Sequence, residues 1–242
     1  MLMFLGYPDT SMSIVNLSST RNAQGRLKEA EELGGPAVEI FKKGLGADQY
    51  STMAAMTKQV SWYMDQGRLA DAEKLGIQVT ETLKVTVGAN DPSTLGSMYI
   101  LATIYWKQGR LEEAEKAYTM IQTRESEAGA DDIILVHCKA ALFVIYTSQG
   151  RWEQAEKLGV EVMEGYGMRF GDVHHWTLSA MDGLASIRMK LGRHDDAIRL
   201  MQSCVDRGTR AFGQDHPDTI LRLVLLKLWK RQRSLTTVFC LR

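Results

Sequence analysis

The chain has 242 residues, enough for one or two globular domains or for a single elongated array of repeats. Apolar residues make up 45% of it and charged residues 24%, so the chain is too hydrophobic to be disordered. Lys plus Arg and Asp plus Glu each total 29. This balance gives no electrostatic reason to expect nucleic acid or an acidic membrane as a partner.

The N-terminal residues and the cysteines bear on the cellular compartment. Residues 1–5 are apolar, but they lack a basic flank and are too few for the apolar core of a signal peptide. No run approaches the roughly 18 apolar residues that a membrane span needs. Cys138, Cys204 and Cys240 are odd in number and widely spaced, which indicates neither a disulfide framework nor a zinc motif. We therefore expect a chain of the reducing cytoplasm.

A Gly-Arg pair recurs along the chain and divides it into repeats. Each pair is followed by a similar run, typified by Leu111-Glu112-Glu113-Ala114-Glu115. Glycine readily adopts the left-handed conformation that ends a helix, and acidic residues suit the first turn of the helix that follows. Each pair is therefore predicted to join a first helix, A, to a second helix, B. The pairs are Gly25-Arg26, Gly67-Arg68, Gly109-Arg110, Gly150-Arg151 and Gly192-Arg193, at spacings of 42, 42, 41 and 42.

A second marker lies about half a period away and separates one repeat from the next. It is clearest at residues 88–94 and 213–219, with weaker forms at Gly46, Gly129 and Gly171, and Pro8-Asp9-Thr10 is another copy. Glycine ends helix B, and Asp-Pro or His-Pro provides a turn and an N-terminal cap. We predict one solenoid over 1–242, with hairpins at approximately 8–45, 46–87, 88–128, 129–170 and 171–212, and a final helix over 217–234.

The packing residues within a repeat resemble a known family. Leu101, Ala102 and Tyr105 share one face of helix A. The motif over 101–115 resembles the 42-residue tetratricopeptide repeats of kinesin light chains, and is similar to the repeat tails of fungal nucleotide-binding, receptor-like signalling proteins. The resemblance implies an all-α fold: a right-handed superhelix, or α-α solenoid, of about five hairpins plus a C-terminal helix.

The terminal repeats depart from this pattern. The packing Tyr is replaced by Arg21 in the first repeat and by Arg188 in the fifth, which suggests that these repeats are degraded. After Ile220 the motif is lost, and residues 225–233 could form a capping helix or mark an abrupt end. An array that starts in mid-repeat and ends irregularly suggests a fragment of a longer parent protein.

The resemblance also implies that the A helices line a concave groove. Tyr99 and Trp106 would form an aromatic patch there, with Lys58, Lys107 and Lys190 around it. We therefore expect an extended or helical peptide with apolar anchors and some acidic character as ligand. The alternative is that both aromatic side chains pack against the neighbouring A helix and that the lysines are solvated. The groove positions carried over are Asn16, Ser19, Asn22, Thr57, Lys58, Ser61, Asp65, Tyr99, Thr103, Trp106, Lys107, Ala140, Val144, Thr147, Asp182, Ser186 and Lys190.

The sequence predicts no catalytic residue, metal site or cofactor. Adjacent His174 and His175 do not converge on one ion as an i,i+4 pair would, and His174 takes the place of His216 in the second marker, so both are expected in a turn. The nucleophile, phosphate-loop, dinucleotide and zinc-protease motifs are absent. Acidic pairs such as Glu112-Glu113 recur with the repeat and are interpreted as structural.

These observations favour a protein-protein interaction scaffold over an enzyme. The leading hypothesis is the repeat segment of a larger signalling or adaptor protein, whose groove binds a peptide or protein segment. The alternative is a self-assembling structural module that forms homo-oligomers through its terminal repeats, favoured by the apolar run from Leu223 to Trp229.

Overall fold

All regular secondary structure in the described residues is α-helical. The structure is a computed structural model that describes residues 8–46, 49–128 and 133–240. The predicted marker at Gly129 lies outside these residues. The helices are α1 (Pro8–Ala23), α2 (Leu27–Leu45), α3 (Tyr50–Asp65), α4 (Leu69–Thr86), α5 (Pro92–Lys107), α6 (Leu111–Ala128), α7 (Ile133–Ser148), α8 (Trp152–Phe170), α9 (His175–Lys190), α10 (His194–Phe212) and α11 (Pro217–Cys240).

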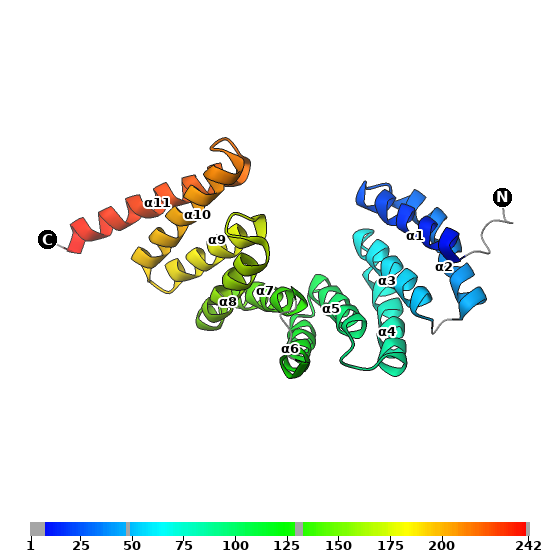
Figure 1. The fold of residues 1–242 in the computed structure, drawn as a ribbon. Coiled ribbons are helices and arrows are strands. Elements are labelled where there is room, and N and C mark those ends of the chain that lie inside the picture. The colour runs from blue at the N-terminus through cyan, green and yellow to red at the C-terminus, as the bar shows by residue number, and fades with distance from the viewer. Residues whose placement is uncertain (1–7, 47–48, 129–132, 241–242) are drawn as a thin grey trace. The chain divides into compact units, whose positions relative to one another are not determined.

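The helices form hairpins within two compact units (Figure 1). Unit 1, Met1–Ala130, contains the hairpins α1–α2, α3–α4 and α5–α6; unit 2, Asp131–Arg242, contains α7–α8, α9–α10 and then α11. Odd-numbered helices are A helices and even-numbered ones are B helices. Each B helix contacts the next A helix of its unit, and in unit 1 α1 contacts α3 and α3 contacts α5. The predicted all-α hairpin solenoid is confirmed, whereas α11 continues to Cys240 instead of ending at residue 234.

Glycine closes each hairpin where the Gly-Arg pairs predict a turn. At Gly109 φ is +78°, a left-handed conformation that side chains with a Cβ rarely adopt. Its N–H donates to the Trp106 carbonyl at 3.0 Å, and the Arg110 N–H donates to the Tyr105 carbonyl at 2.9 Å. These bonds satisfy carbonyls at the end of helix A and hold the next helix at a fixed angle.

The second marker caps the A helices. The Asp91 carboxylate accepts a hydrogen bond from the Ser93 N–H at 2.8 Å, and Pro92 occupies the first turn, where no N–H is needed. The Thr94 hydroxyl donates to the carbonyl of Gly88 at 2.7 Å, which ties the turn to the helix. At α5 the marker therefore sets the start of the A helix by local bonding.

Small residues allow the helices to approach closely. Ala72 and Ala114, from the motif that follows the Gly-Arg pair, are fully buried in their B helices. Gly34 of α2 faces the indole of Trp62 on α3, and an added Cβ would lie 2.1 Å from its Cη2 atom. Since Trp62 belongs to the next hairpin, the core lies between successive repeats and no hairpin buries its apolar face alone.

Candidate peptide-binding face

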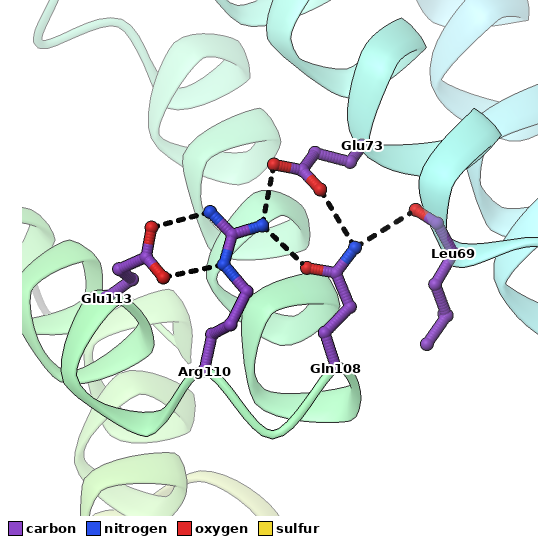
Figure 2. Close-up of polar contacts among 5 residues, drawn as sticks. All are labelled: Leu69, Glu73, Gln108, Arg110 and Glu113. Atoms are coloured by element: carbon purple, nitrogen blue, oxygen red, sulfur yellow. Dashed lines mark hydrogen bonds and ion pairs between the residues drawn. The ribbon is translucent and has the colours of Figure 1, made fainter.

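A charged network joins adjacent repeats and occupies the most prominent acidic residues of the sequence. Figure 2 shows it around Arg110. The guanidinium binds Glu113 of its own repeat through two hydrogen bonds of 2.6 and 2.5 Å, and reaches Glu73 of the preceding B helix at 2.8 Å. It also stacks on Tyr105, 4.4 Å from the ring centroid. The charges that recur in the repeat motif are therefore bound to one another around Arg110.

Gln108 completes this network and affects the ionisation of Glu73. Its amide donates to Glu73 at 2.8 Å and to the Leu69 carbonyl at 3.5 Å, while its oxygen accepts from Arg110 (Figure 2). The Gln108 hydrogen bond, followed by that of Arg110, holds the pKa of Glu73 below its usual value. A carboxylate kept ionised by two fixed donors is a structural anion and a poor proton acceptor.

The arginines that replace the packing tyrosine belong to the same network. Arg188 lies 3.2 Å from Glu156 of α8, and Arg193 binds the same carboxylate at 2.6 Å. In the first repeat, Arg21 reaches Glu29 at 3.8 Å. Arg188 thus forms an ion pair between two repeats at the position where the tyrosine stacks on an arginine elsewhere.

The predicted groove residues of α1 and α3 are mostly engaged with their own helices or with each other. Asn22 is buried and its amide donates to Asp65 on α3. The Thr57 hydroxyl donates to the Met53 carbonyl, and Ser61 donates to Thr57 at a longer 3.4 Å. Exposed members of this group are Asn16, Ser61 and Asp65, whereas Thr57 and Lys58 are half-buried.

On α5 one aromatic residue of the predicted patch, Tyr99, packs against α6, and the other, Trp106, is exposed. The Tyr99 ring lies 5.6 Å from the ring of Tyr118 on α6, and the Thr103 and Tyr118 hydroxyls are 2.9 Å apart. Tyr99 and Thr103 therefore help to hold this hairpin together. Trp106 differs, with 41% of its surface exposed, and Lys107 beside it is also exposed.

On α9 the predicted position Asp182 is paired across to α11. Its carboxylate lies 3.4 Å from Nε of Arg222, whose side chain is buried. Burial raises the pKa of Asp182, and the positive charge of Arg222 opposes that shift. Ser186 is half-buried and Lys190 is exposed at the end of the helix. The structure thus uses Asp182 to hold α11 and leaves Lys190 on the surface.

An exposed apolar row lies on α11, and two of its three members belong to the apolar run from Leu223 to Trp229 that the sequence analysis linked to self-assembly. Leu221, Val224 and Leu228 are 59%, 47% and 50% exposed, and their spacing of three and four residues places them on one side of the helix. Val224 and Leu228 lie 42 residues after Asp182 and Ser186, both predicted groove positions. Extending the 42-residue register beyond Ile220, where the motif fades, would have assigned Val224 and Leu228 to groove positions.

The histidines have structural roles. Nδ1 of His174 accepts a hydrogen bond from the Trp176 N–H, so His174 caps α9 as its place in the marker predicts. His137 packs edge-on against Trp176, with 5.0 Å between ring centroids, and burial lowers the pKa of His137. Across residues 8–46, 49–128 and 133–240, no three His, Cys, Asp or Glu side chains gather into a group that could hold a metal ion.

Cys138 and Cys204 are buried and are not joined in a disulfide. The Cys204 thiol donates to the Leu178 carbonyl, and burial raises its pKa to about 11, which keeps it protonated at neutral pH. Cys138 is likewise buried, while the side chain of Cys240 lies outside those described. No helix in the part of the chain that the structure covers is long and apolar enough to cross a membrane.

Stacked helix hairpins joined by these inter-repeat ion pairs define a tetratricopeptide-repeat protein. The chain belongs to the family of the MalT-like TPR region, whose model matches residues 11–168. A second model, also of a tetratricopeptide repeat, matches residues 177–218. This membership confirms the family resemblance carried by residues 101–115.

Solved structures with the same fold are only distantly similar in sequence. The nearly identical TPR-like repeats of a provisionally assigned kinesin light chain from Podosopora anserina are 21% identical, with a TM-score of 0.70 over 85% of this chain and 98% of that one. BtubC (BKLC) from P. vanneervenii is 16% identical, with a TM-score of 0.64 over 94% and 92%. A comparison with curated protein sequences gives no match.

A third structure carries its repeats within a longer chain. It is a Signal Transduction ATPase with Numerous Domains from Pyrococcus horikoshii, which has a tetratricopeptide-repeat sensor. It is 13% identical, with a TM-score of 0.79 over 93% of this chain and 34% of that one. The chain thus spans about a third of that protein, and the likeness concerns the fold alone.

Proposed function

We propose that this chain is a protein-interaction scaffold that binds a peptide or protein segment on the surface of its A helices. Tetratricopeptide repeats generally serve as such scaffolds. One observation carries the proposal. Charged side chains at the start of the B helices are bound in the arginine network, whereas three side chains on A helices, Trp106, Lys107 and Lys190, are exposed. Exposed aromatic and basic side chains are the residue types on which protein partners are anchored.

We further propose that the chain acts in the cytoplasm as the repeat segment of a larger signalling or adaptor protein, with no catalytic activity of its own. The similarity to the repeat sensor of a longer signalling ATPase supports this context. Buried free thiols support a reducing compartment. The ionised carboxylates of the repeat motif are bound in the inter-repeat network, which removes the most obvious acid or base candidates.

The test compares the wild type with Trp106→Ala in affinity capture from a lysate of the source cells, read by quantitative mass spectrometry. Val85→Ala is the matched control, since Val85 is also a highly exposed apolar residue but lies on the B helix α4. We expect a specific partner to be lost with Trp106→Ala and kept with Val85→Ala. Equal recovery of all partners by the three proteins would remove Trp106 from the binding surface.

Tyr99 is a poor choice for that test. Its ring contacts Tyr118, so truncating it would loosen the hairpin as well as the surface. Tyr118→Phe provides a fold control, because it removes only the hydroxyl that contacts Thr103. A loss of partners with Tyr118→Phe would indicate that hairpin stability, and not the exposed indole, limits capture.

Self-assembly is the second candidate function, and the exposed row on α11 favours it. Contiguous exposed apolar side chains mark interaction sites, and a second copy of the chain could cover them. Sedimentation velocity of the wild type over a range of concentrations tests this idea. A monomer at every concentration contradicts it.

A further inference from the structure

Arg222 occupies a position on α11 that small residues hold in the other A helices. Counted by the repeat period, its equivalents are Ser13, Ala55, Ser97, Cys138 and Ala180. All of them except Ser13, which lies on the first helix, are buried. Ala55 packs with residues of α2 and Ala180 with residues of α8, so a small side chain here lets an A helix approach the hairpin before it. In α11 the same position places a guanidinium in that interface, and only 4% of the residue is exposed.

The guanidinium of Arg222 is poorly satisfied in this interface. Its Nε atom lies 3.4 Å from the Asp182 carboxylate of α9, and among the described residues neither Nε nor Nη1 has a hydrogen-bond partner, although both are closed to solvent. Burying a charge without hydrogen bonds is unfavourable, and attraction to one opposite charge need not offset that cost. Burial also raises the pKa of Asp182 in spite of Arg222. The pair thus fixes where α11 docks without making the docking strong.

The start of α11 also lacks a hydrogen bond that other A helices have. The Thr94 hydroxyl of α5 and the Thr177 hydroxyl of α9 each donate to a glycine carbonyl in the preceding turn, at 2.7 and 2.9 Å. Thr219 holds the equivalent position on α11 and is buried, yet its hydroxyl has no partner in the part of the chain that the structure describes. The first turn of α11 is therefore tied to the turn before it less firmly than those of α5 and α9.

The apolar contacts of α11 are concentrated on α10. Leu226 is the one fully buried apolar side chain among those described on α11, and it lies in a cluster with Met201 and Cys204 of α10. Two half-buried side chains of α11 pack beside it. The bonds that Lys230 and Arg233 make to side chains of α10 are exposed, and such bonds add little stability.

We propose that α11 is a detachable cover of α10, which undocks while the α9–α10 hairpin stays folded, and that the buried Arg222–Asp182 pair keeps the closed state weak enough to open. Undocking would return both charged groups to water and expose Met201 and Cys204. The stability of a repeat array is approximately a sum of repeat and neighbour terms, so a terminal helix with a weak interface can open by itself. The cover would control access to the apolar surface of α10, wherever a partner binds the A helices.

Alkylation of Cys204 in the full chain measures the opening, because this thiol is buried in the cluster that contains Leu226. The chain is treated with iodoacetamide for increasing times, and the modified peptide is followed by mass spectrometry. Hydrogen exchange is measured in parallel for residues 221–228 and for α9. Residues 221–228 lie well before the end of α11, so fraying of that end would spare them. In the wild type we expect these amides to exchange about tenfold or more faster than those of α9, with alkylation of Cys204 at a matching rate.

The main variant combines Arg222→Met with Asp182→Thr. Methionine keeps much of the length of arginine without its charge, and threonine is the residue that α3 carries at the position of Asp182, as Thr57. Replacing both members of a buried ion pair by uncharged residues often stabilises an interface. We expect Cys204 alkylation and exchange of residues 221–228 to slow by about tenfold. Arg231→Met is the matched control, because it removes an exposed arginine from the same helix, and it should behave as the wild type does.

Three results would overturn the proposal. Equal protection of residues 221–228 and α9 in the wild type would show that α11 opens only when the hairpin unfolds. Unchanged or faster alkylation of Cys204 in the double variant, with wild-type helicity, would show that the buried pair does not weaken the closed state. Equal slowing by Arg231→Met would assign the effect to the overall charge of α11. The first comparison needs no substitution, so it tests the proposal even if the double variant misfolds.

Discussion

Single residues in the inter-repeat network have roles that depend on charge as much as on packing. Glu73 is the clearest case, because Gln108 and Arg110 both donate to a carboxylate whose side chain is only 22% exposed. Arg68 binds Glu31 in the same way one repeat earlier, at 2.6 Å. The carboxylate on the B helix thus receives the arginine of the following repeat, which couples the stability of neighbouring hairpins.

Glu73→Gln should lower the free energy of unfolding at pH 7 by about 1–2 kcal/mol, because it removes the charge that two donors bind. Since the pKa of Glu73 is lowered in the folded chain, its contribution is complete above the ordinary value of 4.5 and is lost as the pH falls through the lower folded pKa. Urea unfolding of both proteins at several pH values measures the difference.

The difference between wild type and Glu73→Gln should therefore shrink as the solution is acidified below about pH 4.5. Glu81→Gln is the matched control, because Glu81 pairs only with Lys84 of its own helix and is largely exposed. A constant difference at all pH values, or an equal effect of Glu81→Gln, would contradict the role given to Glu73.

At the scale of elements, two glycines of α5 and its turn differ in backbone conformation. Gly109 ends α5 with a positive φ, whereas Gly96 lies inside α5, where an added Cβ would meet nothing within 4 Å. Gly109 needs a left-handed backbone conformation that residues with a Cβ rarely adopt. Gly96 has an ordinary helical conformation, so the absence of a side chain gives it no advantage.

Gly109→Ala should destabilise the chain by about 1–2 kcal/mol, because the left-handed conformation strains a residue with a Cβ. Gly96→Ala should stabilise it by about 0.5–1 kcal/mol, because alanine restricts the unfolded chain and favours helix. Thermal unfolding followed by circular dichroism compares both variants with the wild type. Changes of the same sign would refute the assignment of these two glycines.

At the scale of the whole molecule, the chain divides into two compact units, Met1–Ala130 and Asp131–Arg242. Stability in repeat proteins is approximately a sum of repeat terms and nearest-neighbour terms. A local defect in unit 1 is therefore expected to act mainly on the repeats beside it.

Hydrogen exchange of the Glu73→Gln variant tests this expectation. Amides of α4 and α5 should exchange faster than in the wild type, while amides of α9 and α10 keep their protection. Mass spectrometry of peptic fragments resolves the two units. Equal acceleration throughout the chain would show that the molecule unfolds as one cooperative unit.

The sequence by itself determined the repeat period, the two helices of each hairpin and the turns between them. It could do so because these features depend on residues close in sequence: Gly109 needs only its own backbone conformation, and Asp91 caps a helix two residues away. Trp106 is exposed, and its place in a binding groove remains a prediction. The expectation that 1–242 form a single solenoid remains a prediction.

Only the tertiary structure decided which side chains are exposed and which hold the repeats together. Asn22 matched the groove pattern but is buried against Asp65, and Arg188 departed from the repeat pattern but binds Glu156. Such pairs join residues that lie 43 and 32 positions apart, so no local pattern reports them. The exposure of Leu228 also depends on distant residues, because it is set by which side of α11 packs against α10. Contacts between the two helices determine that side, and the residues of α11 alone do not.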